Sequence, residues 1–424
     1  MTGASELNRG PKLRAWQHSL IFLAAAAVVV ARRPDAMIHA QFYAEGGHVW
    51  FADAYNFGWW SALLRTQDGY FQVFARLGAA LALLAPMAQA PLVLNLLAIV
   101  AQALPVNLLM SGRSAGWGPW RFRALLGASC VLLPDYGEMS YSITESQWVL
   151  ALCVFLLLVA EPARNMPGRV FDVAVISLSS VSGPFCAFFL PIAIFVAWTR
   201  RQAWRWVPVG LLAMAVMIQA YGLLVIDRHG RAHVPLGASA DLFVRILGGN
   251  VVLGAILGRI PLATMPGRGM FILLLCAALA GVAGVTFCFI RSTFEYRLFV
   301  VFAAMIFLVS IVFPHNSRPA AGTTAWWLLA EATGARYWFL PSLAVAWTVL
   351  GCAWKGNAAV QAASVILLCG MGFGVVANFR LPGLSDLHYA EYVRNFEAAP
   401  PGTVMEFQEN PPGWVIRLVK RTAQ

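Results

Sequence analysis

The feature that most constrains this chain is the recurrence of segments of nearly 20 apolar residues, separated by short loops that carry arginine. A helix of about 20 apolar residues is long enough to cross a hydrocarbon core of about 30 Å. The sequence therefore predicts an all-α polytopic membrane protein with about 11 transmembrane helices. The expected spans are 17–31, 91–110, 122–134, 147–160, 169–182, 184–198, 206–226, 269–290, 298–313, 337–354 and 358–376.

Composition supports this fold class. The 424 residues are 60% hydrophobic and only 12% charged, whereas a soluble domain carries about 25% charged residues. The formal net charge of +11 suits arginines that orient membrane helices better than a nucleic-acid partner, which we do not expect. The seven cysteines lie in or beside apolar segments without a CxxC motif, which indicates small core residues.

Loop charge predicts the orientation of the chain. Arg9, Lys12 and Arg14 precede the first span. We therefore expect a multi-pass protein of the cell inner (plasma) membrane with its N-terminus on the cytoplasmic side and its C-terminus on the external side. The arginine-rich inner loops are 111–123, 161–169, 199–205 and 291–297. The expected external segments are 32–90, 135–146, the turn at 182–183, 227–268, 314–336 and the tail from 377.

This orientation affects one apolar run in particular. If both the end of the first span and residue 90 are external, the hydrophobic stretch 71–88 cannot cross the membrane. We expect it to lie in the interface or to enter and leave by the same face. The chain then divides into a transmembrane domain, 1–376, and a small external C-terminal segment, 377–424, in which "QENPPG" predicts a hairpin turn.

Most titratable residues fall on the predicted external side, where two acidic clusters lie close to the membrane. Glu45 and Asp53 belong to "FYAEGGHVWFADAYNFGWW", and Glu138 and Glu145 belong to "PDYGEMSYSITES". Carboxylates that lose hydration near a membrane surface are suited to act as general bases. The bland alternative is that they are solvated loop acids. The other external candidates for substrate binding are Arg76, Arg336, His48 and His315.

The remaining motifs are weaker. An arginine such as Arg336, at the start of a span, can hold a phosphate or extend to lipid headgroups. His229 and His233 are four residues apart, a spacing that can hold a metal ion on a helix. The glycine- and proline-containing sequence around them is more typical of a solvated loop.

The order of these parts resembles the GT-C superfamily of membrane glycosyltransferases, which use polyprenyl-phosphate sugars. The residues that carry the resemblance are "YAEGG", "VWFADAYNFGWWSALL" and "DGYFQVFARLGAALALL" in the first external loop, "PDYGEMSYSITESQW", and "ARYWFLP". They are similar to the family's acidic loop start, its two juxtamembrane helices, its second acidic loop and the opening of a late span. The family text usually has Asp-Glu where this chain has Ala44-Glu45, which keeps Asp53 as a rival for the base.

The resemblance implies an external site in which Glu45 or Asp53 deprotonates an acceptor hydroxyl and an arginine stabilises the phosphate leaving group. The implied partners are a polyprenyl-phosphate-sugar donor, a lipid or polysaccharide acceptor and membrane lipid. The resemblance implies no certain cofactor, and a divalent metal ion remains an alternative. The alternatives are a polytopic transporter and another lipid-linked transferase.

Overall fold

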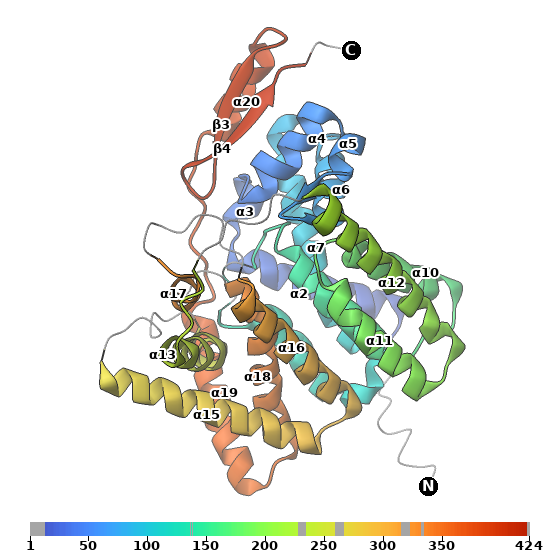
Figure 1. The fold of residues 1–424 in the computed structure, drawn as a ribbon, viewed down its shortest axis with the longest axis vertical. Coiled ribbons are helices and arrows are strands. Elements are labelled where there is room, and N and C mark those ends of the chain that lie inside the picture. Colours follow the sequence, from blue (N-terminus) through green and yellow to red (C-terminus); the bar gives the residue numbers. More distant parts are fainter. Residues whose placement is uncertain are drawn as a thin grey trace.

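The computed structural model describes residues 13–135, 137, 139–227, 235–258, 267–314, 323–331 and 335–421. The chain is a mostly helical polytopic protein with little sheet (Figure 1). Within the described ranges, eight helices are long and apolar enough to cross a membrane. They are Ala15–Arg32, Met87–Met110, Ala203–Ile226, Ala240–Leu257, Arg268–Arg291, Phe294–Val312, Arg336–Lys355 and Ala358–Ala377.

Seven of the eleven predicted spans coincide with these long helices. They contain α2 (Ala15–Arg32), α7 (Ala90–Met110), α12 (Trp206–Tyr221) with η5 (Gly222–Ile226), α15 (Arg268–Arg291), α16 (Phe294–Val312), α18 (Ala335–Lys355) and α19 (Ala358–Ala377). The other four predicted spans are helices of 13 to 15 residues: α8 (Trp120–Leu132), α9 (Ser146–Val159), α10 (Met166–Ser180) and α11 (Cys186–Arg200).

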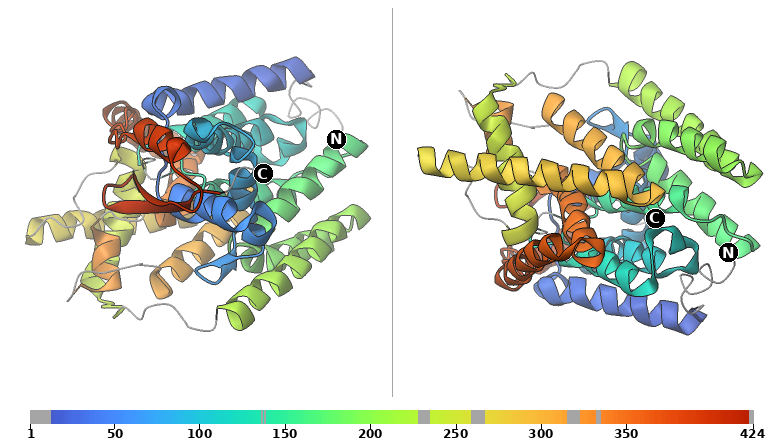
Figure 2. Two further views of the ribbon diagram at one scale, coloured as in Figure 1. Left: turned by 90° about the horizontal axis from the view of Figure 1, so that it is seen from above. Right: turned by 90° about the horizontal axis from the view of Figure 1, so that it is seen from below.

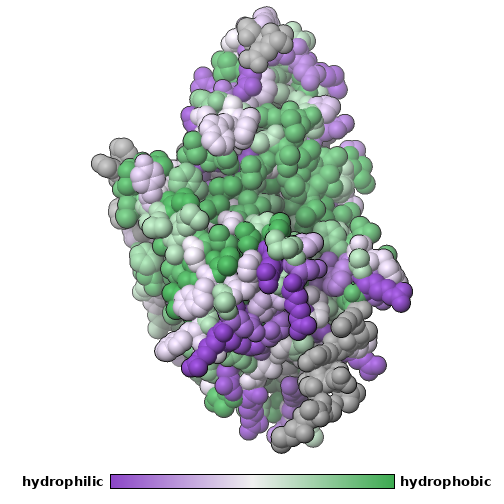
Figure 3. Space-filling view, turned by 90° about the vertical axis from the view of Figure 1, so that its right-hand side faces the viewer, coloured by the Kyte–Doolittle hydropathy of each residue, from purple (hydrophilic) through white to green (hydrophobic). Residues whose placement is uncertain are grey.

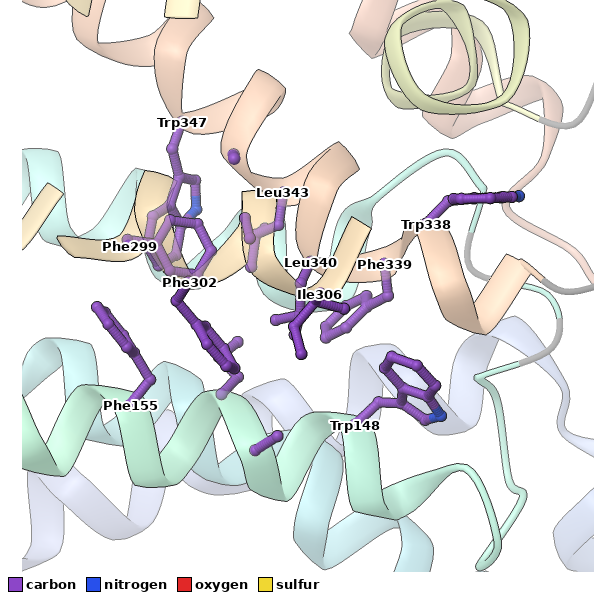
Figure 4. Packing of buried hydrophobic residues seen from close by; sticks show 14 of the residues in the cluster. Trp148, Phe155, Phe299, Phe302, Ile306, Trp338, Phe339, Leu340, Leu343 and Trp347 are labelled. Carbon is purple, nitrogen blue, oxygen red and sulfur yellow. The ribbon is translucent and has the colours of Figure 1, made fainter. Parts of the chain in front are cut away.

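Helix α9 lies at the centre of the bundle, and its sequence explains why. "SQWVLALCVFLLLV" is apolar on every side, which is the pattern of a helix with no face left for water. All of its residues except Gln147 are buried. Phe155 stacks on Phe302 of α16 with 5.4 Å between ring centroids, and Phe299 of the same helix contacts Trp347 of α18 (Figure 4).

The predicted inner loops gather at one end of the bundle, where ion pairs join them. Arg113 of η3 (Gly112–Trp117) donates to both oxygens of Asp172 on α10, at 2.9 and 2.6 Å. Arg200 bonds Glu161 and Glu295, which ties the end of α11 to the start of α16. The loops that positive charge assigns to one side are thus neighbours in space. We call this the far end.

The opposite end joins the last turns of three helices to the C-terminal tail. The fully buried Arg32, the last residue of α2, donates to the carbonyls of Val131 and Leu133 at the end of α8. It also donates to the Asn378 carbonyl, directly after α19. Because the tail continues from here into the C-terminal cap, we call this the cap end.

The described part of 227–268 contains a long helix where the sequence predicted only a connecting segment. It consists of α13 (Ala240–Val244), η6 (Arg245–Leu253) and α14 (Gly254–Leu257), and Figure 1 shows α13 end-on while α18 runs down the page. Leu236, just before it, accepts from Trp326 of α17 (Ala325–Ala330), and the Leu257 carbonyl accepts from Asn378. Trp326 also donates to Ile311 at the C-terminal end of α16. Both ends of this helix therefore lie against cap-end segments.

The first loop forms a layer of short helices at the cap end. Its elements are α3 (Asp35–Ile38), η1 (Gly46–Phe51), α4 (Ala52–Phe57), α5 (Trp59–Leu63), the strand pair β1 (Thr66–Gln67) and β2 (Tyr70–Phe71), and α6 (Val73–Ala82). Helix α6 has 10 residues, about 15 Å of rise, which is too short for a membrane crossing. This length is consistent with the prediction that 71–88 does not cross the membrane, which stays a prediction. The short helices η2 (Met87–Gln89) and η4 (Ala203–Arg205) precede α7 and α12.

The tail after α19 folds into a cap on this layer (Figure 2). Helix α20 (Tyr389–Ala398) packs on a hairpin of β3 (Val404–Glu409) and β4 (Trp414–Val419), whose register pairs Phe407 with Ile416. The hairpin was predicted from "QENPPG". Tyr389 and Phe396 of the cap belong to the same apolar cluster as Phe42 and Trp50 of the first loop, so the tail is not a separate core.

The surface is consistent with a multi-pass membrane protein. Figure 3 shows a broad hydrophobic area on one side of the molecule, with hydrophilic side chains gathered towards the two ends. On α11 and α12, which lie on this side in Figure 1, Trp198, Met214 and Met217 are exposed. In water such a surface would be unfavourable, whereas lipid covers it without cost.

Candidate functional site

Glu45 stands at a sharp turn that the cap holds in place. Ala44 has φ of +50°, a left-handed conformation that a residue with a Cβ seldom adopts. The Ala44 N–H donates to the Asn410 carbonyl at 2.7 Å, and the Asn410 N–H donates to the Phe42 carbonyl at 3.2 Å. The chain then turns through a bond from the Gly46 N–H to the Tyr43 carbonyl and enters η1. Glu45 is thereby fixed at the first turn of this helix.

The helix start is capped by Glu409, which lies 362 residues further along the chain from Gly47. The Gly47 N–H donates to Oε2 of Glu409 and the His48 N–H donates to Oε1, both at 3.1 Å. The His48 ring bonds the same Oε1 through Nδ1 at 2.7 Å. A Cβ on Gly47 would lie 2.2 Å from Oε2 of Glu409, so only glycine allows this approach.

The Glu45 side chain does not cap the helix that it precedes. Glu45 is the residue that precedes the helix, but its side chain makes no capping hydrogen bond, because Glu409 already holds the Gly47 and His48 amides. Its Oε2 is buried and has no hydrogen-bond partner among the described residues. A buried carboxylate oxygen without a donor is uncommon in folded proteins, and such groups are candidates for a functional role.

Charge couples His48 to both carboxylates. Burial disfavours the imidazolium, but the hydrogen bond and the charge of Glu409 outweigh it, with a smaller contribution from Glu45, and raise the pKa of His48 above its usual 6.5. Burial raises the pKa of Glu409, against the opposing effect of its bonds from His48 and Gly47. Three N–H groups point at this carboxylate, so we describe the pair as an imidazolium on a carboxylate. His48 thus serves the cap contact and is not a free ligand.

Asp53 is held by two arginines. Arg76 donates to Oδ2 at 3.0 Å, and Arg65 lies 3.5 Å from Oδ1. The Arg76 side chain is 1% exposed, compared with 43% for Arg65. Arg76 also lies over the Trp50 ring, 5.0 Å from its centroid, and burial lowers the pKa of its guanidinium. The cluster has two positive charges against one negative charge.

A second ion pair joins the other acidic loop to α18. Arg336 donates to Oε1 of Glu145 at 2.9 Å, and the Glu145 side chain is 4% exposed. Thr144, next to Glu145, accepts a hydrogen bond at 2.8 Å from Nε1 of Trp50, the residue beneath Arg76. The two predicted acidic regions are therefore joined through Trp50 and Thr144.

Glu138 and His315 lie outside the described residues, as do His229 and His233. In the part of the chain that the structure describes, no three His, Cys, Asp or Glu side chains lie close enough together to hold a metal ion.

Sequence reasoning missed Glu409 and Asn410, which make the largest contribution to the geometry around Glu45. The local text "MEFQENPPG" indicates a strand and a turn and gives no sign of a partner hundreds of residues away. The one available signal was the adjacent pair Gly46-Gly47 at a helix start, which marks a place where another group approaches the backbone.

Comparison with known proteins adds no assignment. No protein-family model matches the chain, and no curated protein matches it.

Proposed function

We propose that this protein is a membrane glycosyltransferase that moves a sugar from a polyprenyl-phosphate donor to a lipid or glycan acceptor at the cap end. The observation that carries the proposal is the Glu45 carboxylate. It lies at a turn fixed from both sides by the cap, and its Oε2 has no hydrogen-bond partner in the described chain. A positioned carboxylate with an unused oxygen is what general-base chemistry requires.

Glu45 is a better candidate for the base than Asp53. Both oxygens of Asp53 already lie beside arginine donors, so a proton from an acceptor would compete with two guanidinium groups. We assign Asp53 the role of holding Arg65 and Arg76 in place. Substitution of Asp53 should therefore affect donor binding and stability before it affects proton transfer.

The charge balance suggests where the donor phosphate lies. The Asp53 cluster has one positive charge more than it has negative charges, whereas Arg336 forms an ion pair with the carboxylate of Glu145. An excess guanidinium charge favours a phosphate. Arg65 is exposed enough to touch a ligand, and the buried Arg76 would act behind it, so this cluster is our first choice and Arg336 the second.

The proposed reaction breaks one bond and forms another. The acceptor hydroxyl gives its proton to Glu45, and its oxygen attacks the anomeric carbon. The bond from that carbon to the phosphate oxygen breaks, and polyprenyl phosphate leaves with the electron pair. Arginine stabilises the negative charge that develops on the phosphate in the transition state.

The sides of the membrane follow from charge. The arginine-rich far end is assigned to the cytoplasm by the positive-inside rule, with the N-terminus there, and the cap end to the external face. The contacts of the helix Ala240–Leu257 support this scheme: both of its ends lie against cap-end segments, so we infer that it adds no net crossing.

The test is transfer from a panel of polyprenyl-phosphate pentoses and hexoses, labelled in the sugar, to total membrane lipid and glycan acceptors. We expect release of polyprenyl phosphate by the wild-type protein and a loss of roughly 10²–10⁴-fold in Glu45→Gln. Asp53→Asn is the matched comparison. Wild-type rates in Glu45→Gln with loss in Asp53→Asn would move the base to Asp53, and failure of the wild-type protein on every donor would refute the proposed activity.

A further inference from the structure

A pocket opens at the far end of the bundle, away from the cap and the site described above. It lies between the C-terminal ends of α15 and α18, the start of α16 and the segment that leads into α8. The cavity itself is about 80 Å³ and opens to the surface of the bundle, so a ligand would occupy it only in part. Six of its 15 lining residues are aromatic: Trp117, Phe122, Phe287, Tyr296, Trp347 and Trp354.

Two cations stand among the lining residues. Arg291 is the last residue of α15 and Lys355 the last residue of α18. Neither forms an ion pair with a carboxylate of the described chain. Arg291 lies over the Phe287 ring at 4.3 Å, and Glu295 is buried and bound to Arg200. Basic residues at helix ends also favour the helix dipole, but that effect does not require an aromatic pocket beside them.

The pocket is placed where lipid can reach it. Ile290, next to Arg291, is 66% exposed, and Trp354, next to Lys355, is 39% exposed. Exposed tryptophan beside basic residues at the ends of apolar helices is typical of the level of lipid headgroups. An apolar wall below two uncompensated cations fits a ligand with a tail and an anionic head.

We propose that this pocket binds an anionic phospholipid of the leaflet at the far end. Its phosphate would lie between Arg291 and Lys355, and the upper part of an acyl chain would lie against the aromatic wall. Basic pockets between membrane helices bind anionic headgroups in this way. The proposal is independent of the glycosyltransferase activity, because it uses none of the residues at the cap end.

The experiment uses the full-length protein in detergent, with three probes. Dioleoylphosphatidylglycerol tests the complete ligand, dioleoylphosphatidylcholine tests the tail without net charge, and inorganic phosphate tests the anion without a tail. Lipid retained by the protein is counted by native mass spectrometry, and affinity is taken from the rise in thermal-unfolding midpoint during titration. We expect saturable stabilisation by phosphatidylglycerol alone.

One pair of variants tests whether the two cations of the pocket, and not the general surface charge, bind the headgroup. Arg291→Ala/Lys355→Ala should weaken phosphatidylglycerol binding roughly 30-fold, since each basic residue near a headgroup contributes about a factor of five. Arg164→Ala/Arg201→Ala removes two exposed arginines of the far end that do not line the pocket, so it should bind as the wild type. Equal weakening in both double variants would reduce the effect to general surface charge and overturn the proposal.

Gly351 provides an independent test of the tail. A Cβ there would be in ordinary van der Waals contact with Sγ of Cys288 at 3.8 Å, and Gly351 lines the pocket, so Gly351→Leu keeps both cations and places a side chain in the pocket. We expect this folded variant to lose phosphatidylglycerol binding. Unchanged binding in Gly351→Leu, equal stabilisation by phosphatidylcholine, or equal stabilisation by inorganic phosphate would each overturn the proposal.

Discussion

Replacing Glu409 with glutamine should release the start of η1 without unfolding the membrane bundle. Its two carboxylate oxygens each accept one backbone N–H, from Gly47 and from His48. Glutamine has one oxygen and one NH₂ group, so whichever way it turns, one buried backbone N–H faces another donor. A hydrogen bond to a charged acceptor contributes about 1.5–3 kcal/mol. The local opening equilibrium should therefore rise roughly 10- to 150-fold.

Amide hydrogen exchange in the full-length protein measures this opening at the residues concerned. The Gly47 and His48 amides should exchange faster by that factor in Glu409→Gln. The Ala44 amide, which donates to Asn410, reports whether the whole cap has moved or only the carboxylate contact is lost. Transfer activity should fall together with the loss of protection, because Glu45 would no longer be fixed.

The matched control lies on the same strand. Glu406 is exposed and pairs across the hairpin with Arg417, so Glu406→Gln removes the same charge without a contact to η1. Its exchange pattern should equal that of the wild type. If Glu409→Gln left the Gly47 and His48 amides as slow as Glu406→Gln does, the capping role of Glu409 would be refuted.

Three further predictions follow from the same geometry. Gly47→Ala places a methyl group against the capping carboxylate of Glu409 and should lower the thermal-unfolding midpoint. At Gly46 the nearest atom to an added Cβ is 3.7 Å away, so Gly46→Ala should be tolerated. Similar midpoints for the two variants would contradict the close approach of Glu409 to Gly47. The pKa of His48 is raised in the folded protein, so its contribution to stability is complete below pH 6.5 and disappears as the pH rises through the pKa of the folded state. The thermal-unfolding midpoint should therefore fall more between pH 6 and pH 9 in the wild type than in His48→Gln. Parallel curves for the two proteins would exclude this linkage. Single cysteines at Ala238 and Leu257 of a cysteine-free chain should react with an impermeant maleimide from the same face, and labelling from opposite faces would show that this helix crosses the membrane.

The sequence was most informative where one local property decides the outcome. Charge counting placed 71–88 outside the spans, and the short α6 agrees because ten helical residues cannot reach across the bilayer. "QENPPG" indicated the hairpin, since proline and glycine restrict which backbones can join two strands. These features depend on a few neighbouring residues.

The crosswise helix at 240–257 was missed for a physical reason. Its centre reads "LGGN", which suggests a break. In the structure Gly248 lets α15 approach so closely that a Cβ would lie 2.0 Å from the Leu274 carbonyl oxygen. Small residues at a helix contact serve this purpose in membranes. Likewise, no local pattern could pair Glu409 with Gly47, because that contact exists only after the whole bundle has formed.

The long separation between Gly47 and Glu409 has a consequence for biogenesis. Synthesis proceeds from the N-terminus, so the first loop is made while the ribosome has yet to make most of the bundle. The carboxylate that caps η1 is translated only after α19, the last long helix, has been made. Until then the left-handed turn at Ala44 has no Asn410 carbonyl to hold it. A partly made chain can therefore insert its early helices and still lack an ordered Glu45, so the site matures only when translation is almost complete.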